Sequence, residues 1–333
     1  KIRLNNGQNI EGSEVHKLMT VNGWTQMSEL RIGDLIKIRR DSSVNYEGGV
    51  SIEGVDFYCN AKLYDIPTCM SEDLALFLGM MAADGHLQDV SGHVGLTKND
   101  LKVGELFASL VKKLFNVTVK HTIDPRNNVN SWHFNSRAIS KWIKQLIGYR
   151  SFDKHVPEQI YAGSRQEMKM FLAGLSLDGY STTCSNENIT CIYCGRSKEL
   201  ADGAFSLLKA LGYAPRQGTK KVYGYDYVVH SISAKGIDFC VQEHKNSINS
   251  TNTEYVKIPT EVTSLDISST TTPYYCRRNW LQRQLTVCRE DIFIQNFPGV
   301  EYEKDFYYAK ITHVFNDKNE VYDIEVEESH DYL

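Results

Sequence analysis

Two apolar stretches with helical spacing each end in Asp-Gly, and they are the clearest pattern in the chain. They cover Phe77–Gly85 and Phe171–Gly179, and both are rich in leucine and in small residues. Polar residues suited to a helix N-terminus precede each stretch, including a Ser-x-x-Glu capping box that begins at Ser164. We therefore predict two helices that end at Asp84 and Asp178, 94 positions apart (178 − 84).

The same order of patterns follows both helices. Alternating residues predict strands, and apolar residues three and four positions apart predict helices. After the first helix we expect a hairpin, a helix, two strands and a helix at 86–97, 101–115, 117–123, 131–135 and 137–147. After the second we expect the corresponding elements at 181–193, 197–211, 215–222, 225–233 and 235–243. The centre of the chain is therefore predicted to be an internal repeat of two αββαββα halves.

Short strand-like segments flank this centre on both sides. They lie at 2–4, 8–10, 16–21, 30–38, 306–314 and 321–326. This order is expected when one domain is inserted into another, so we predict an α+β protein. Its expected parts are the start of a flanking β domain with a linker, two central halves, a connecting segment and the end of the β domain, at 1–65, 66–165, 166–262, 263–302 and 303–333.

The net charge of −4 conceals an uneven distribution. Residues 66–260 contain 22 Lys and Arg against 18 Asp and Glu, a net charge of +4, and the flanks contain the remaining 15 against 23, a net charge of −8. Residues 101–150 alone contain nine basic and two acidic residues. A local basic surface attracts phosphates whatever the average charge, although a solvated helix face would have the same composition.

Hydropathy and cysteine usage narrow the class of protein. No apolar run approaches the roughly 20 residues that span a bilayer, and the first residues lack the apolar stretch of a signal peptide. The eight cysteines show no disulfide-framework spacing, and Cys191 and Cys194 form a single CxxC pair where a zinc site needs four ligands. We expect no membrane partner, reduced cysteines, and an intracellular location in the cytoplasm or the nucleus.

Small residues within the two predicted helices favour close packing of their backbones. The first helix contains Gly79 and the second contains Gly174. Helices that pack at such positions would bring Asp84 and Asp178 within reach of a shared cation. Mg²⁺, for which Mn²⁺ can substitute, prefers oxygen ligands and keeps several waters, and such sites cleave phosphodiesters. The alternative is that each Asp-Gly only ends a helix and begins a turn.

Residues 76–87 and 171–180 resemble the two motifs of single-chain LAGLIDADG homing endonucleases. The second motif departs from the pattern, because Gly174 precedes Asp178 by four positions, one fewer than in the first motif. Either Ala173 takes the place of the motif glycine or one residue is deleted. The resemblance implies a monomer with pseudo-twofold halves, which binds a long double-stranded DNA site and cuts both strands with Mg²⁺ or Mn²⁺.

The same resemblance assigns further residues to the site. The family places a lysine shortly before a proline near the active site in each half, which corresponds to Lys154 and Lys257. These lysines would polarise solvent or stabilise the charged transition state, unless each is an ordinary surface lysine. The implied fold places two four-stranded sheets over the DNA major groove. We expect DNA contacts from basic and aromatic residues on or near those strands, namely Lys98, Lys120, Arg126, Arg137, Arg196, Arg216, Lys220, Lys221 and Tyr225.

The flanks resemble the Hint fold of inteins, which excise themselves from a host protein. His16 matches the histidine that promotes the first acyl shift, and Asp323 and His330 match positions that assist cleavage at the downstream junction. The implied partners are the host-protein exteins. An intein's first Cys or Ser and its final His-Asn are not in the sequence, so we expect no splicing by the chain as given. Residues 263–302 are expected to be a linker or an additional DNA-contacting segment.

Two other functions are compatible with the sequence. The shortened second motif also fits a degenerate relative that binds DNA without cutting it, or an RNA maturase. A third alternative is a protein that acts mainly as a splicing element and whose nuclease has decayed.

Overall fold

The structure is a computed structural model that describes residues 1–39, 46–54, 64–88, 90–125, 128–184, 187–221, 227–235, 237, 239 and 306–315. These residues form two four-stranded sheets and one six-stranded sheet. None of the helices in the described ranges is long and apolar enough to cross a membrane.

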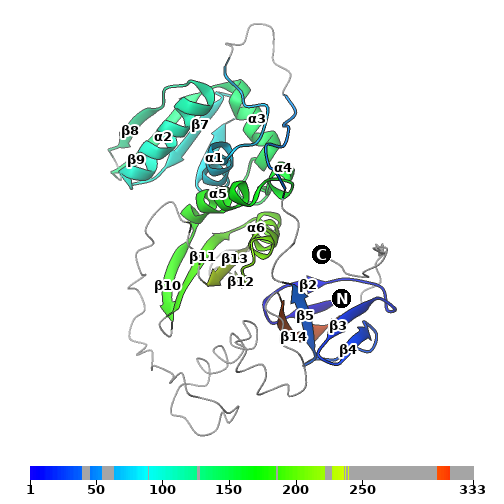
Figure 1. Cartoon of the computed structure of the whole chain (residues 1–333). Coiled ribbons are helices and arrows are strands. Elements are labelled where there is room, and N and C mark those ends of the chain that lie inside the picture. The colour runs from blue at the N-terminus through cyan, green and yellow to red at the C-terminus, as the bar shows by residue number, and fades with distance from the viewer. Residues whose placement is uncertain are drawn as a thin grey trace.

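The first α/β half follows the predicted order of elements (Figure 1). Its elements are α1 (Glu72–Ala83), β6 (Gly85–Gln88), β7 (His93–Thr97), α2 (Leu101–Phe115), β8 (Lys120–Asp124), β9 (Val129–Asn135) and α3 (Arg137–Ile147). The strands form an antiparallel sheet in the order β6-β7-β9-β8. The predicted bounds of α2 and α3 are confirmed, because Asp100 and Ser136 cap their N-termini and the positive φ angles of Asn116 and Gly148 end them.

The second half repeats this order after a short helix, α4 (Glu158–Tyr161). Its elements are α5 (Arg165–Leu175), the 3₁₀ turn η1 (Ser176–Asp178), β10 (Tyr180–Cys184), β11 (Glu187–Gly195), α6 (Lys198–Ala210), β12 (Arg216–Lys221) and β13 (Val228–Lys235). The sheet order β10-β11-β13-β12 matches that of the first half strand for strand. The capping box predicted at Ser164 is present. The helix predicted at 235–243 lies almost wholly outside the described residues.

Helices α1 and α5 pack side by side between the two four-stranded sheets (Figure 1). Buried side chains from both halves form one hydrophobic core around them. Phe77 of α1 packs against Phe107 and Phe115, and Phe115 meets the Trp142 ring edge-on. This core holds the ends of both central helices in place relative to the sheets.

Strands from both ends of the chain form the third sheet, in the order β2-β1-β14-β5-β3-β4. The strands are β1 (Ile2–Leu4), β2 (Asn9–Ile10), β3 (Lys17–Thr20), β4 (Gly23–Gln26), β5 (Leu35–Arg39) and β14 (Phe306–Val314). β14 pairs antiparallel with both β1 and β5, although the two α/β halves separate it from them in the sequence. The doubled unit is therefore inserted between strands of one sheet. The resemblance of this sheet to a Hint fold stays a prediction.

Two local predictions were wrong in detail. The strand predicted at 117–123 begins only at Lys120, because the chain leaves α2 through the left-handed Asn116 before it reaches β9. The second Asp-bearing helix is α-helical only as far as Leu175, and the 3₁₀ turn η1 continues it to Asp178.

Candidate active site

The first aspartate lies at the junction between α1 and β6. Ser71 caps the start of the helix by accepting the Leu74 backbone N–H, and Asp84 follows the last helical residue. The Asp84 backbone N–H still donates to the Met80 carbonyl, at 3.2 Å, and the Asp84 side chain is 27 % exposed. A Cβ at Gly85 would lie 2.5 Å from the Met81 Cα, so only glycine fits directly after the aspartate. Asp84 is therefore held on a fixed turn and remains open to solvent.

The two Asp-bearing helices touch through their glycines. A Cβ at Gly79 would lie 2.1 Å from the Phe171 carbonyl oxygen, and a Cβ at Gly174 would lie 2.3 Å from the Leu76 carbonyl oxygen. Any larger side chain at either position would push the backbones apart. The reciprocal contacts make Gly174 the structural counterpart of Gly79, so the second motif is one residue shorter beyond its glycine.

The 3₁₀ turn compensates for this missing residue. Five α-helical steps of about 1.5 Å carry the chain about 7.5 Å from Gly79 to Asp84. One α step and three 3₁₀ steps of about 2.0 Å carry it the same distance, about 7.5 Å, from Gly174 to Asp178. Both motifs therefore advance equally far from the glycine contact to the aspartate.

The ends of the two motifs meet at the ammonium of Lys98, which follows β7. Its Nζ forms an ion pair with the Asp84 carboxylate and donates to the Leu177 carbonyl oxygen at 2.9 Å. Leu177 directly precedes Asp178, so one cation links the acidic residue of the first motif to the end of the second. The sequence indicated Lys98 only as a DNA contact, because its contacts depend on the crossing of two distant helices.

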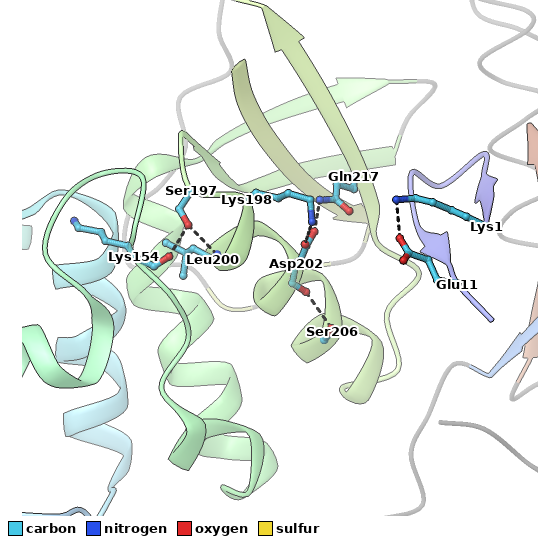
Figure 2. Close-up of polar contacts among 9 residues, drawn as sticks. All are labelled: Lys1, Glu11, Lys154, Ser197, Lys198, Leu200, Asp202, Ser206 and Gln217. Carbon is cyan, nitrogen blue, oxygen red and sulfur yellow. Dashed lines mark hydrogen bonds and ion pairs between the residues drawn. The ribbon is translucent and has the colours of Figure 1, made fainter. Parts of the chain in front are cut away.

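Lys154 is buried beneath Asp84. Its Nζ donates to the carbonyl oxygens of Met81 at 2.8 Å, Gly85 at 3.0 Å and Ala83 at 3.3 Å. An ammonium at this place satisfies carbonyls at the end of α1 and lies at the negative end of its dipole. The Lys154 carbonyl in turn accepts the Ser197 hydroxyl at the start of α6, as Figure 2 shows. Lys154 thus connects the second half to the turn that carries Asp84, and its catalytic role stays a prediction.

Three histidines that the sequence pattern did not single out line the sheet next to Asp84. The Nε2 atoms of His86 and His93 are 3.1 Å apart, and the His93 ring stacks on His133. Burial lowers the pKa of His86, and the positive charges of His93, His133 and Lys154 lower it further. The alternation of polar residues along the strands was the only signal for them in the sequence.

The strand register assigns these side chains to one face of the first sheet. His133 pairs with Lys120 and with Gly95, whereas its neighbour Trp132 covers Gly104 of α2 on the helix side. Because side chains alternate along a strand, the exposed Lys120 shares the open face with His133. This placement fits the expected contact of Lys120 with DNA.

The remaining predicted DNA contacts are spread over both halves. Arg137 is exposed and donates to the Val90 carbonyl at 3.0 Å. Arg196 lies over the Tyr227 ring at 4.2 Å. The predicted contacts on β12 divide between two faces, because Lys221 alternates to the face of the buried Ile232 and Arg216 and Lys220 to the opposite face.

Several site predictions lie outside the described residues, namely Arg126, Tyr225, Lys257, Asp323 and His330. His16 is described and half-buried, and its backbone bonds Ser13 and Met27 in the turn before β3. Cys191 and Cys194 are unbridged and both lie on β11.

The second half is tied to the six-stranded sheet through β12. The Gln217 side chain donates to Asp202 of α6 at 2.7 Å, and its backbone N–H donates to the Asn6 carbonyl at 2.7 Å. Figure 2 shows Gln217 and Asp202 next to the N-terminal segment, where Lys1 pairs with Glu11 at 2.6 Å. These contacts lie away from the Lys98 ammonium and serve to join the two parts.

The donors at the helix ends suit a cation that keeps part of its water shell. In the described part of the chain no group of three or more His, Cys, Asp or Glu side chains could hold a metal ion on its own. A carboxylate and a neighbouring carbonyl oxygen are the ligand types that Mg²⁺ prefers, with water completing its octahedron. Zinc, which takes four protein ligands in structural sites, is a poorer fit.

Comparisons with known proteins give distant matches, and no protein-family model matches the chain. It is 25 % identical over 234 residues to the replicative DNA helicase DnaB of Synechocystis, covering 65 % of this chain and 24 % of the helicase. It is 23 % identical over 242 residues to a replication factor C small subunit of Thermococcus kodakarensis, covering 70 % and 24 %. Against one component of the A-type ATP synthase of Pyrococcus abyssi the identity is 26 % over 280 residues, covering 80 % and 26 %. The chain thus spans about a quarter of the length of these relatives.

Similar solved structures include the homing endonuclease I-DmoI in complex with DNA and Mn. That match has 17 % identity and a TM-score of 0.35, and covers 48 % of this chain and 89 % of I-DmoI. The N-terminal LAGLIDADG domain of WhiA matches with 16 % identity and a TM-score of 0.35, covering 50 % and 78 %. Scores this low do not establish a function, and we therefore base the function on the geometry of the chain itself.

Proposed function

We propose that this chain is a metal-dependent DNA endonuclease of the two-motif LAGLIDADG type, which cuts both strands of a long double-stranded site as a monomer. The observation that carries the proposal is the meeting of the two motif ends at Lys98. An ion pair between helix ends that lie 94 residues apart in the sequence is more than two independent Asp-Gly turns require. It marks a position where oxygen atoms from both motifs attract positive charge.

Asp84 and Asp178 are the proposed ligands of Mg²⁺, or of Mn²⁺ in its place. The bound metal would lower the pKa of an attacking water and neutralise charge on the phosphate. Asp84 holds its carboxylate at the seam because Gly85 and the Met80 carbonyl fix its backbone. Lys154 keeps that turn in shape from below, and we assign the corresponding role in the second half to Lys257.

The open faces of the two four-stranded sheets are the proposed DNA-binding surface. Lys120 and the histidines next to Asp84 lie on the face of the first sheet, and Lys220 is exposed on β12 of the second. Lysine and arginine contacts to phosphates supply sequence-independent affinity, and polar side chains on the strands read base edges in the major groove.

An inserted, intein-type origin fits the arrangement of the flanks. One sheet is built from strands on both sides of the doubled unit. The relatives carry the names of three different proteins, and the chain matches only about a quarter of each. A mobile element carried within unrelated host proteins would give such a pattern. On this proposal the chain's partners are double-stranded DNA and the exteins of a host protein, and it acts inside the cell.

A DNA-binding relative without nuclease activity is the second candidate, and the shortened second motif favours it. The 3₁₀ turn argues for the nuclease, because it carries Asp178 about as far from the glycine contact as Asp84.

The test is cleavage of a supercoiled plasmid library that carries random inserts, in the presence of Mg²⁺. The proposal expects linear plasmids that share an insert sequence, and it expects Asp84→Asn and Asp178→Asn to bind that sequence without linearising it. Asp73→Asn is the matched control, because Asp73 is on the first turn of α1 and pairs with Lys113 away from the seam. Linearisation by both Asp84→Asn and Asp178→Asn would show that the metal ligands are wrongly assigned. Recovery of bound but intact plasmid with the unchanged chain would favour the second candidate.

A further inference from the structure

The ammonium of Lys98 lies where a shared metal ion would lie. It contacts the Asp84 carboxylate and the Leu177 carbonyl oxygen, so two of its three N–H donors reach oxygen atoms of the two motif ends. A divalent cation bound at the seam would need the same oxygen atoms. The side chains of Lys98 and Asp84 are 20 % and 27 % exposed, so a cation from solvent can approach the pair.

The two lysines of the site differ in how firmly they are held. Lys154 is buried, and three carbonyl oxygens surround its ammonium. Lys98 is anchored at its backbone, where its N–H donates to the Asn130 carbonyl at 3.0 Å, but its long side chain reaches the seam from the end of β7. Its ammonium can therefore leave without breaking the strand pairing, whereas that of Lys154 cannot leave without exposing the end of α1.

We propose that Lys98 is a built-in cation that occupies the shared metal position in the metal-free protein and is displaced when a divalent metal binds. The inference rests on the proposed function, since it takes the seam to be a metal site. Lys98 keeps the two motif ends together when no metal is bound, and it lowers the affinity for free metal. After displacement its ammonium is free to pair with a phosphate of bound DNA, which agrees with the DNA contact expected from the sequence.

The test is Mn²⁺ binding to the full chain without DNA, measured from the electron paramagnetic resonance signal of free Mn²⁺. Lys98→Met keeps the length of the side chain and removes its charge. It should bind Mn²⁺ roughly tenfold more tightly than the unchanged chain, because the metal no longer competes with a charged hydrogen bond. Lys98→Arg, which keeps the charge, should not gain affinity.

The matched control is Lys113→Met. Lys113 forms an ion pair with Asp73 on the surface of the same half, so this variant also loses one lysine–aspartate pair, but away from the seam. Its Mn²⁺ affinity should equal that of the unchanged chain. Asp84→Asn should abolish the gain that Lys98→Met produces.

Equal or weaker Mn²⁺ binding by Lys98→Met would overturn the inference, and so would an equal gain in Lys113→Met. The plasmid assay separates this failure from failure of the nuclease. Cleavage by the unchanged chain together with no gain in Lys98→Met removes only the role of Lys98. A gain that depends on Asp84 without any cleavage supports Lys98 as the displaced cation and removes the nuclease. No Mn²⁺ binding by either protein contradicts both.

Discussion

The two Asp-bearing motifs reach the same depth by different local structures. The first is α-helical until Asp84, and the second changes to a 3₁₀ turn for its last three residues, Ser176–Asp178. The glycine contact is reciprocal, so the difference lies entirely beyond Gly79 and Gly174. A one-residue deletion is therefore absorbed by a change of helix type, which argues that the distance from the glycine contact to the aspartate is under constraint and that the number of residues is not.

The motifs also differ in the charges around them. Lys98 and Lys154 both act on the first motif, one at its carboxylate and one at its carbonyl oxygens. Lys98 reaches the second motif only at the Leu177 carbonyl. The half that supplies both lysines thus organises the seam, and variants of either half should have unequal effects.

Lys154→Met should be the most destabilising of the changes considered. It removes a buried ammonium and leaves the Met81, Ala83 and Gly85 carbonyls without their donor. We expect the free energy of unfolding in urea to fall by about 3 kcal/mol. The exposed Lys113→Met serves as the control and should change it by less than about 1 kcal/mol. A similar small change for both variants would mean that the second half does not support the Asp84 turn through Lys154.

Insertion of one alanine between Leu175 and Ser176 should restore the longer spacing of the first motif and damage the site. The added residue would carry Asp178 more than about 1 Å further along the axis and rotate it, and a misplacement of this size costs on the order of a hundredfold in rate. Plasmid cleavage measures the effect, and circular dichroism checks that the fold is kept. Undiminished cleavage would show that the 3₁₀ turn does not position the aspartate.

Gly79→Ala and Gly174→Ala should destabilise the protein by similar amounts, because each added Cβ meets a backbone carbonyl of the other helix. We expect a loss of about 2 kcal/mol for each, even though alanine favours a helix. Gly54→Ala is the control, since its Cβ would meet nothing within 4 Å. Chemical denaturation gives the three values. A marked difference between the two seam variants would contradict the equivalence of Gly79 and Gly174.

Acid should destabilise the first half slightly more than the second. Burial lowers the pKa of His86 and His133 in the first half and of His230 in the second. A histidine whose folded pKa lies below its unfolded pKa of about 6.5 binds more protons when unfolded. The free energy of unfolding should therefore fall as the pH drops through about 6.5 and level off below the folded pKa. His86→Gln should reduce this dependence more than His230→Gln, and equal reduction would contradict the expected asymmetry.

Local patterns predicted the elements well, and long-range contacts set the limits of prediction. The bounds of α2 and α3 came from apolar spacing and from caps such as Asp100 and Ser136, which act within a few residues. The close approach of α1 and α5 followed from their small residues. The 3₁₀ ending of the second motif and the position of Lys98 could not be predicted, because both depend on how two helices 94 residues apart meet in space.

The central claim is that one divalent cation binds between Asp84 and Asp178. Anomalous diffraction from crystals soaked in Mn²⁺ tests it most directly. The account predicts a manganese peak at the seam, within about 2.5 Å of a carboxylate oxygen of each aspartate, with the Lys98 ammonium moved away. A peak elsewhere, or a seam in which Lys98 keeps both contacts at saturating Mn²⁺, would contradict it.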